Sequence, residues 1–124
     1  MKTILIIDDE SHIRDIYKRI LQATCRTIFN VVESADIQEA TVYLSQEKID
    51  LVLLDIRIPN VNVKEIYQMI QECHPNVKVM VASVYPIEQQ KKIVPFATDY
   101  YDKSEGPIRL LGKITESFLV QAVA

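Results

Sequence analysis

Glycine is almost absent from this chain. Of the 124 residues only Gly106 and Gly112 are glycines, and both lie near the C-terminus. A P-loop or a dinucleotide-binding turn requires glycines directly after a strand, where the backbone approaches a phosphate closely. Because the rest of the chain offers none, the sequence excludes both kinds of nucleotide site.

Other features are equally scarce. The two cysteines, Cys25 and Cys73, are not spaced as metal ligands, so we expect free thiols. No apolar run is long enough to span a membrane, and the apolar N-terminus ends at Asp8 before a signal peptide could form. The net charge of −3, with acids and bases interspersed, lacks the basic surface that nucleic-acid binding requires. We therefore expect a cytoplasmic protein that binds neither membranes nor nucleic acid.

Short aliphatic runs alternate with longer amphipathic segments along the chain. The runs predict strands at Thr3–Asp8, Phe29–Glu33, Leu51–Asp55, Val77–Ala82 and Thr98–Tyr101. The amphipathic segments predict helices at about 11–24, 36–46, 63–73, 87–94 and 107–120. This alternation predicts an α/β fold of the (βα)5 type, a doubly wound parallel five-stranded sheet, in a single domain over residues 1–124.

Apolar spacing also predicts which helix faces are buried. The stripe of the first helix is Ile13, Ile16, Tyr17, Ile20 and Leu21, and that of the last helix is Ile108, Leu111, Ile114 and Phe118. In the fifth strand Tyr100 and Tyr101 are adjacent, so we expect one side chain to point inward and the other outward.

Polar residues follow the predicted strands at their C-terminal ends, where open α/β sheets place their ligand sites. Asp8 and Asp9 follow the first strand, Asp55 ends the third, and Ser83 and Lys103 follow the last two. Adjacent carboxylates repel each other unless a cation or water separates them. Three carboxylates at two strand ends therefore predict a hard-cation site, with Mg²⁺ as its occupant.

The same residues suit phosphoryl transfer. Asp55 stands alone at its strand end and is the natural nucleophile, so the product would be an aspartyl phosphate. Lys103 offers a point charge for phosphate oxygens, and Ser83 offers a hydroxyl donor. Taken singly, each has a simpler interpretation: Asp55 as a turn residue, Ser83 as the N-cap of the fourth helix, and Lys103 as a solvated loop lysine.

Four motifs give the chain a resemblance to a known family. They are IIDDE at 6–10, LVLLDIRIP at 51–59, VMVAS at 79–83 and DYYDK at 99–103. In this order and spacing they resemble the response-regulator receiver domain of bacterial two-component signalling, over essentially the whole chain. The resemblance implies the flavodoxin-like receiver fold, and a signalling protein in place of an enzyme.

The resemblance also implies roles for the acidic residues. Asp55 would accept a phosphoryl group from a histidine kinase or phosphotransfer protein. Asp9 would bind Mg²⁺ directly and Asp8 mostly through water, with Asp55 and the backbone carbonyl of Arg57 completing the site.

Further roles concern the response to phosphorylation. Lys103 would contact the phosphoryl oxygens, Ser83 would be the switch hydroxyl, and Tyr100 the switch aromatic that turns inward. The surface of the fourth helix, fifth strand and fifth helix would then change its contacts with an output protein or output domain. Homodimer formation on phosphorylation is left open.

Some positions depart from the family pattern. Val63 replaces a glycine, and because a β-branched residue avoids positive φ, we expect a different backbone path there. Val84 replaces a small residue beside the phosphoryl group and could slow attack by water. Ser104 replaces a proline, so we expect a trans peptide before it. Pro95 and Phe96 replace a glycine in a slightly shortened segment, which predicts a short or displaced fourth helix.

Two other functions compete with the phosphorylated receiver. An aspartyl-phosphate hydrolase would need a second carboxylate two residues beyond Asp55, where Arg57 stands. A pseudo-receiver, a binding module that works without phosphate, is kept open by Val63 and Val84. The chain could also be the N-terminal receiver of a longer transcriptional regulator.

Overall fold

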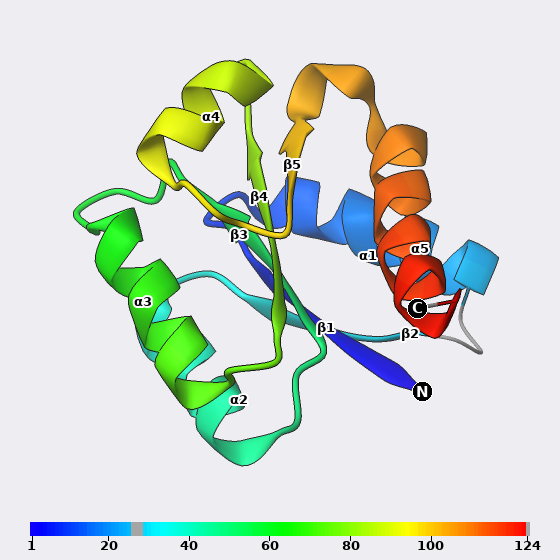
Figure 1. The fold of residues 1–124 in the computed structure, drawn as a ribbon, viewed down its shortest axis with the longest axis horizontal. Helices are drawn as coiled ribbons and strands as arrows, with labels where there is room; N and C mark the ends of the chain where they lie inside the picture. The colour runs from blue at the N-terminus through cyan, green and yellow to red at the C-terminus, as the bar shows by residue number, and fades with distance from the viewer. Residues whose placement is uncertain (26–28, 124) are drawn as a thin grey trace.

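The computed structural model describes residues 1–25 and 29–123, which form one parallel sheet flanked by helices (Figure 1). The strands are β1 (Lys2–Ile7), β2 (Phe29–Ser34), β3 (Leu51–Asp55), β4 (Lys78–Ser83) and β5 (Asp99–Asp102). The helices are α1 (Ser11–Cys25), α2 (Ile37–Gln46), α3 (Val63–Cys73), α4 (Ile87–Ile93) and α5 (Pro107–Val123), with a short 3₁₀-helix η1 (Lys103–Glu105).

The strand order is β2-β1-β3-β4-β5, and each neighbouring pair is parallel. The predicted (βα)5 fold is therefore confirmed. The chain runs from β1 to the edge strand β2 and then crosses back to β3 on the other side of β1. Reversals of this kind leave a crevice at the carboxyl ends of the two strands on either side, here β1 and β3.

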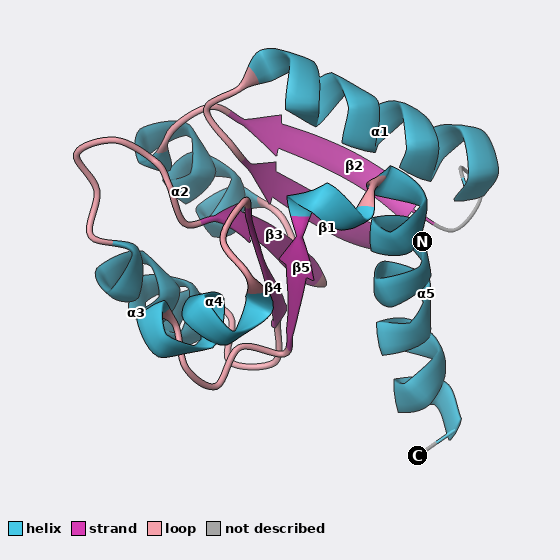
Figure 2. Cartoon of the chain, turned by 90° about the horizontal axis from the view of Figure 1, so that it is seen from above, coloured by secondary structure: helices cyan, strands magenta, loops and turns pink. Residues whose placement is uncertain are grey.

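Both faces of the sheet are buried, which explains why the strands are continuous aliphatic runs. Helices α1 and α5 cover one face, and α2, α3 and α4 cover the other (Figure 2). Successive residues of β1 alternate between the two cores: Leu5 and Ile7 face α2 and α3, whereas Ile4 and Ile6 face α1 and α5.

This double burial corrects the expectation for the two tyrosines of β5. Tyr100 and Tyr101 are both buried, with 7% and 1% exposure, and they belong to opposite cores. Neither points to solvent, because the fifth strand has helices over both faces.

The predicted helix stripes are wrong at two positions. Ile16 of α1 is 41% exposed and Ile108 of α5 is 71% exposed. In α5 the buried pair is Leu110 and Ile114, which are four residues apart and share a face. Ile108 precedes Leu110 by two residues and therefore lies on the far side of the helix.

The structure bears on three expectations drawn from the unusual residues. Val63 opens α3 with helical backbone, and the positive φ in that loop (60°) belongs to Asn60. That the loop follows a different path from that of the family stays a prediction. The peptide before Ser104 is trans. Helix α4 has seven residues, so it is short as expected.

Of the cysteines, Cys73 is exposed and free, and the side chain of Cys25 lies outside the described residues. In the described part of the chain, no helix has the length and apolar character needed to cross a membrane.

Phe96, in the turn between α4 and β5, stands in a strained conformation. Its φ is 68°, in the left-handed region, and its side chain is 93% exposed. Left-handed backbone costs a non-glycine residue roughly 1–2 kcal/mol, more than the entropy that glycine loses on folding. We expect Phe96→Gly to raise the free energy of unfolding by about 0.5–1 kcal/mol in urea denaturation.

Asn60→Gly is the matched control for this variant. Asn60 also has positive φ, but asparagine tolerates this region well, so its replacement should bring no gain. The hydrogen bond from Tyr67 Oη to the Phe96 carbonyl (2.9 Å) involves only the backbone of residue 96 and survives the change. Equal effects of the two glycine substitutions would contradict the assignment of strain to Phe96.

Candidate functional site: an acidic pocket at the strand ends

The predicted carboxylates gather at one edge of the sheet. Asp8 follows β1 and Asp55 ends β3, two neighbouring strands. Carboxylate oxygens of Asp8, Asp9 and Asp55 lie within 4.8 Å of one another. Asp8 and Asp55 are 2% and 3% exposed, whereas Asp9 faces solvent. The cluster therefore combines two buried acids with one that is open to solvent.

Main-chain hydrogen bonds hold both buried carboxylates. Glu10 N donates to Asp8 Oδ1 and Arg57 N donates to Asp55 Oδ1, each at 2.9 Å. Both bonds join a carboxylate to the N–H two residues further on, the geometry of an Asx turn. Arg14 of α1 adds a bond from Nη1 to the Asp8 carbonyl (2.7 Å). The two carboxylates are thus oriented by backbone that the strands and α1 position.

Lys103, the first residue of η1 directly after β5, completes the cluster. Its Nζ lies 3.0 Å from Asp8 Oδ2 and 3.5 Å from Asp55 Oδ2, and its side chain is only 12% exposed. The solvated-lysine interpretation is therefore wrong. A capping box fixes the start of η1: the Asp102 carboxylate accepts from Ser104 N, and Glu105 Oε1 accepts from Asp102 N.

The charges in the pocket do not balance. Burial raises the pKa of Asp55, although the Arg57 N–H and the Lys103 ammonium oppose the rise. Burial alone would lower the pKa of Lys103, but the carboxylates of Asp55 and Asp8 outweigh it and raise that pKa. Three carboxylates thus share a single ammonium. Carboxylate oxygens are the ligands that hard divalent cations prefer, so the donor set fits such an ion.

Ser83 lies at the same edge, inside β4. Asp55 pairs with Ala82 across β3 and β4, so Ser83 stands one residue beyond the level of Asp55. It is fully buried, and its Oγ accepts from Tyr85 N at 3.1 Å. The N-cap of α4 is Pro86, which excludes the alternative of Ser83 as the cap.

Tyr100 already points inward in this structure. Its Oη donates to the Val94 carbonyl (2.6 Å) and accepts from Ala97 N (3.2 Å). The buried ring thereby ties β5 to the segment that follows α4.

A cavity of about 300 Å³ opens above the carboxylates; its lining is Asp9, Glu10, Asp55, Arg57, Pro59, Val84 and Lys103. Arg57 lies at the mouth, with its guanidinium carbon 5.5 Å from the centre of the Tyr85 ring. Val84 is 55% exposed and narrows the same opening. The predicted metal-ligand role of the Arg57 carbonyl stays a prediction.

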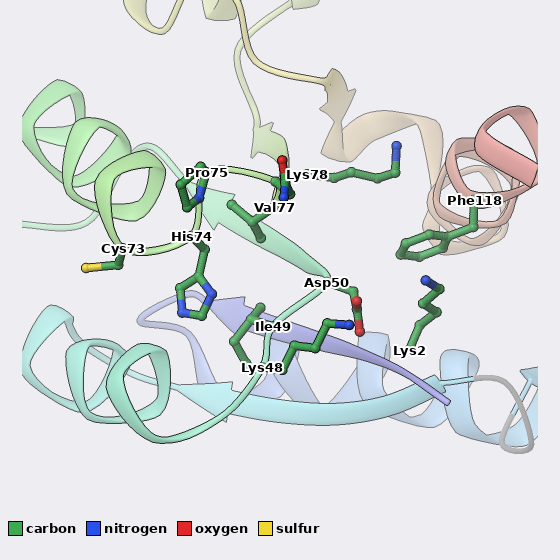
Figure 3. Close-up of a pocket in the computed structure, with 11 residues that line it drawn as sticks. Lys2, Lys48, Ile49, Asp50, Cys73, His74, Pro75, Val77, Lys78 and Phe118 are labelled. Atoms are coloured by element: carbon green, nitrogen blue, oxygen red, sulfur yellow. The ribbon is translucent and has the colours of Figure 1, made fainter. Parts of the chain in front are cut away.

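A slightly larger cavity, about 350 Å³, lies at the other end of the strands, where β1, β3 and β4 begin (Figure 3). Its charged residues include Lys2, Lys48 and Lys78 around Asp50. Asp50 is the single carboxylate among the described residues that line it, and one oxygen of Asp50 accepts from Thr3 N. Without converging acids it offers no comparable cation site, so the chemistry of the lining, and not cavity size, marks the candidate site.

Sequence reasoning missed two residues that hold this edge together. Arg14 binds the Asp8 carbonyl, and Gln90 of α4 is completely buried against the ends of β4 and β5. Gln90 lies in the polar run from Glu88 to Lys92, which is typical of a solvated helix. No signal in the sequence distinguishes it from its neighbours.

The fold and this pocket together define a class of protein. The sequence model of the response regulator receiver domain matches residues 4–115, so the chain belongs to that family. Receiver domains are signalling domains of two-component systems, and the resemblance noted in the sequence is confirmed.

Individual relatives agree with this assignment. Regulatory protein VanRc of Enterococcus gallinarum is 27% identical over 113 residues, which cover 90% of this chain and 47% of the relative. The transcriptional regulatory protein YvrH of Bacillus subtilis matches with the same identity and coverage. The chain thus spans about half the length of these curated relatives.

Solved structures show the same likeness. A receiver domain protein from Methanospirillum hungatei has 27% identity and a TM-score of 0.86, over 98% of this chain and 97% of that one. Response regulator TrrA from Thermotoga maritima, solved in complex with Mg²⁺-BeF, has 26% identity and a TM-score of 0.79, over 94% and 99%.

Proposed function

We propose that this chain accepts a phosphoryl group on Asp55 in a Mg²⁺-dependent reaction and passes the signal on through altered protein contacts. The observation that carries the proposal is the convergence of Asp8, Asp9, Asp55 and Lys103 on one pocket. The Mg²⁺-BeF complex of a relative with the same fold supports it. The donor is a histidine kinase or a phosphotransfer protein, as in the family.

The geometry supports a division of labour. Asp8, Asp9 and Asp55 would hold Mg²⁺, which would neutralise charge on the phosphoryl oxygens. A carboxylate oxygen of Asp55 forms the bond to phosphorus as the N–P bond to the donor histidine breaks, and the imidazole leaves with the electron pair. Lys103, already 3.5 Å from Asp55 Oδ2, moves its ammonium onto the phosphoryl oxygens.

The response passes through the end of β4. On phosphorylation Ser83 Oγ leaves Tyr85 N and donates to a phosphoryl oxygen, which shifts the loop into α4. Because Tyr100 is already buried and bound to Val94 and Ala97, its contribution is to carry that shift into the α4–β5 segment. The changed face of α4, β5 and α5 contacts an output protein or output domain.

Amide NMR spectra test this function without the unknown kinase. We expect Mg²⁺ to shift signals around Asp9 and Asp55. Beryllium fluoride, a stable mimic of the aspartyl phosphate, should then shift Ser83 and Lys103 with the effect spreading to Tyr100. The second set of shifts should require Mg²⁺, because the anion adds negative charge to a pocket of carboxylates.

Other outcomes would point elsewhere. Mg²⁺ shifts with no response to beryllium fluoride would favour the pseudo-receiver, with Val84 and Arg57 blocking the pocket. No Mg²⁺ response at all would overturn both the metal site and the phosphorylation proposal.

A further inference from the structure

Gln90 is a buried polar residue on an otherwise solvated stretch of helix. Its exposed fraction is 0%, whereas Glu88, Gln89, Lys91 and Lys92 are all exposed. Its side-chain Nε2 donates to the carbonyls of Tyr85 (2.8 Å) and Tyr101 (2.9 Å), and lies 3.5 Å from the carbonyl of Ser83. One amide group therefore links the end of β4, the loop that follows it and β5.

The environment of Gln90 favours a specific role over simple packing. Its Oε1 is buried and has no hydrogen-bond partner among the described residues. An unpaired buried oxygen loses its hydration without compensation, so an apolar side chain would fill this space at lower cost. What an apolar side chain cannot supply is the NH₂ group that binds the three carbonyls.

The three carbonyls lie close in sequence to Ser83 and Lys103, the two residues that would bind the phosphoryl oxygens. Ser83 and Tyr85 lie on either side of Val84, and Tyr101 precedes Lys103 by two residues. The Gln90 amide thus sets the separation between the backbone of Ser83 and the backbone that carries Lys103. It has no hydrogen bond to Asp8, Asp9 or Asp55, which are the proposed metal ligands.

We infer that Gln90 is a positioning residue for the proposed phosphorylation site. It holds the Ser83 hydroxyl and the Lys103 ammonium at the spacing that the phosphoryl oxygens require, and it transmits movement of the Ser83 segment to α4. This inference rests on the proposed function. It predicts that loss of the amide weakens binding of the phosphoryl group while metal binding is unaffected.

Gln90→Met tests the inference, since methionine keeps the length of the side chain without its donors. In NMR titrations at saturating Mg²⁺ we expect the apparent affinity for beryllium fluoride to fall at least about tenfold, because misplaced donors weaken charge-assisted hydrogen bonds. The Kd for Mg²⁺ should stay within about twofold of the wild type, since the carboxylates are untouched. Gln90→Leu, of similar volume and also without the NH₂ group, should give the same pattern and serves if Gln90→Met does not fold.

Val94→Ala is the matched control. Val94 is 1% exposed at the end of α4 and packs into the core between the sheet and helices α2, α3 and α4. Its side chain has no hydrogen-bond donor for the three carbonyls. It should loosen α4 and leave both affinities near the wild-type values.

Four results would overturn the inference. Unchanged affinity for beryllium fluoride in the Gln90 variants would show that the amide does not position the site. A fall in the Mg²⁺ affinity of the Gln90 variants, parallel to that for beryllium fluoride, would show that the substitution loosens the whole site. The same loss of beryllium fluoride affinity in Val94→Ala would show that any loosening of α4 has this effect. A wild-type protein that ignores beryllium fluoride would refute the proposed function itself, and the inference with it.

Discussion

Asp55→Asn is expected to abolish phosphorylation completely and, at the same time, to stabilise the fold. Asparagine keeps the shape of the side chain and the oxygen that accepts from Arg57 N. Its neutral amide lacks the carboxylate oxygen that attacks phosphorus, so it cannot form an acyl phosphate. Labelling with a small-molecule phosphoryl donor, followed by intact mass, should show no adduct on the variant.

The gain in stability follows from the direction in which the pKa of Asp55 is shifted. A carboxyl whose pKa is raised by burial is protonated more readily in the folded than in the unfolded state. Its ionisation therefore destabilises the fold as the pH rises through the unfolded and then the folded pKa, and the penalty is complete above the folded pKa. Without Mg²⁺ at pH 7, the free energy of unfolding of the variant should exceed that of the wild type by about 1 kcal/mol. This size is common for a single stabilising substitution.

Two comparisons sharpen this prediction. Mg²⁺ should stabilise the wild type more than the variant, because a ligand stabilises the state that binds it. Asp50→Asn, just before β3 at the opposite end of that strand, should leave labelling intact. Retained full labelling of Asp55→Asn would refute the assignment of the phosphoacceptor.

Lys103→Ala is expected to weaken binding of the phosphoryl mimic without weakening binding of the metal. The Lys103 ammonium binds Asp8 and Asp55, the same carboxylates that would hold Mg²⁺. Its removal takes a competing positive charge from the site, so the Mg²⁺ affinity should stay equal or rise. The same change removes a charge-assisted contact to the phosphoryl oxygens, worth roughly 2–3 kcal/mol, so binding of beryllium fluoride should weaken about 30- to 160-fold.

Separate NMR titrations with Mg²⁺ and with beryllium fluoride at saturating Mg²⁺ measure the two effects. Lys64→Ala, on the exposed side of α3, removes the same charge at a distance and should alter neither affinity appreciably. A normal activated-state spectrum for Lys103→Ala would disprove the role given to this lysine. A large loss of Mg²⁺ affinity would show that it organises the carboxylates instead.

Much of the candidate site could be predicted because it depends on strand ends. A parallel sheet brings the carboxyl ends of neighbouring strands to one edge, so aliphatic runs that end in Asp8, Asp55 and Ser83 were enough to predict convergence. The same runs predicted the strand types, since only strands covered on both faces can be apolar throughout. The short α4 also followed from the sequence, through the residues that replace the usual glycine.

Side-chain orientation was less predictable. The stripe assigned to α5 was wrong at Ile108, because the rotation of a helix about its axis is set by what it packs against. Tyr101 was expected to differ from Tyr100 in burial, but α1 and α5 cover the face on which Tyr101 lies. The stacking of Arg57 over Tyr85 joins two loops from different strands, and spacing along the chain carries no information about such a contact.

The sequence by itself determined the order of strands and helices, the identity of the acidic and basic groups, and the edge of the sheet at which they meet. These features depend on local periodicity and on the polar residue that ends each apolar run. Only the tertiary structure decided that Lys103 pairs with Asp8 and Asp55, that Tyr100 is held inward, and that Gln90 is buried. Each of these depends on contacts between segments far apart in the chain, whose geometry is set by the packing of helices on the sheet.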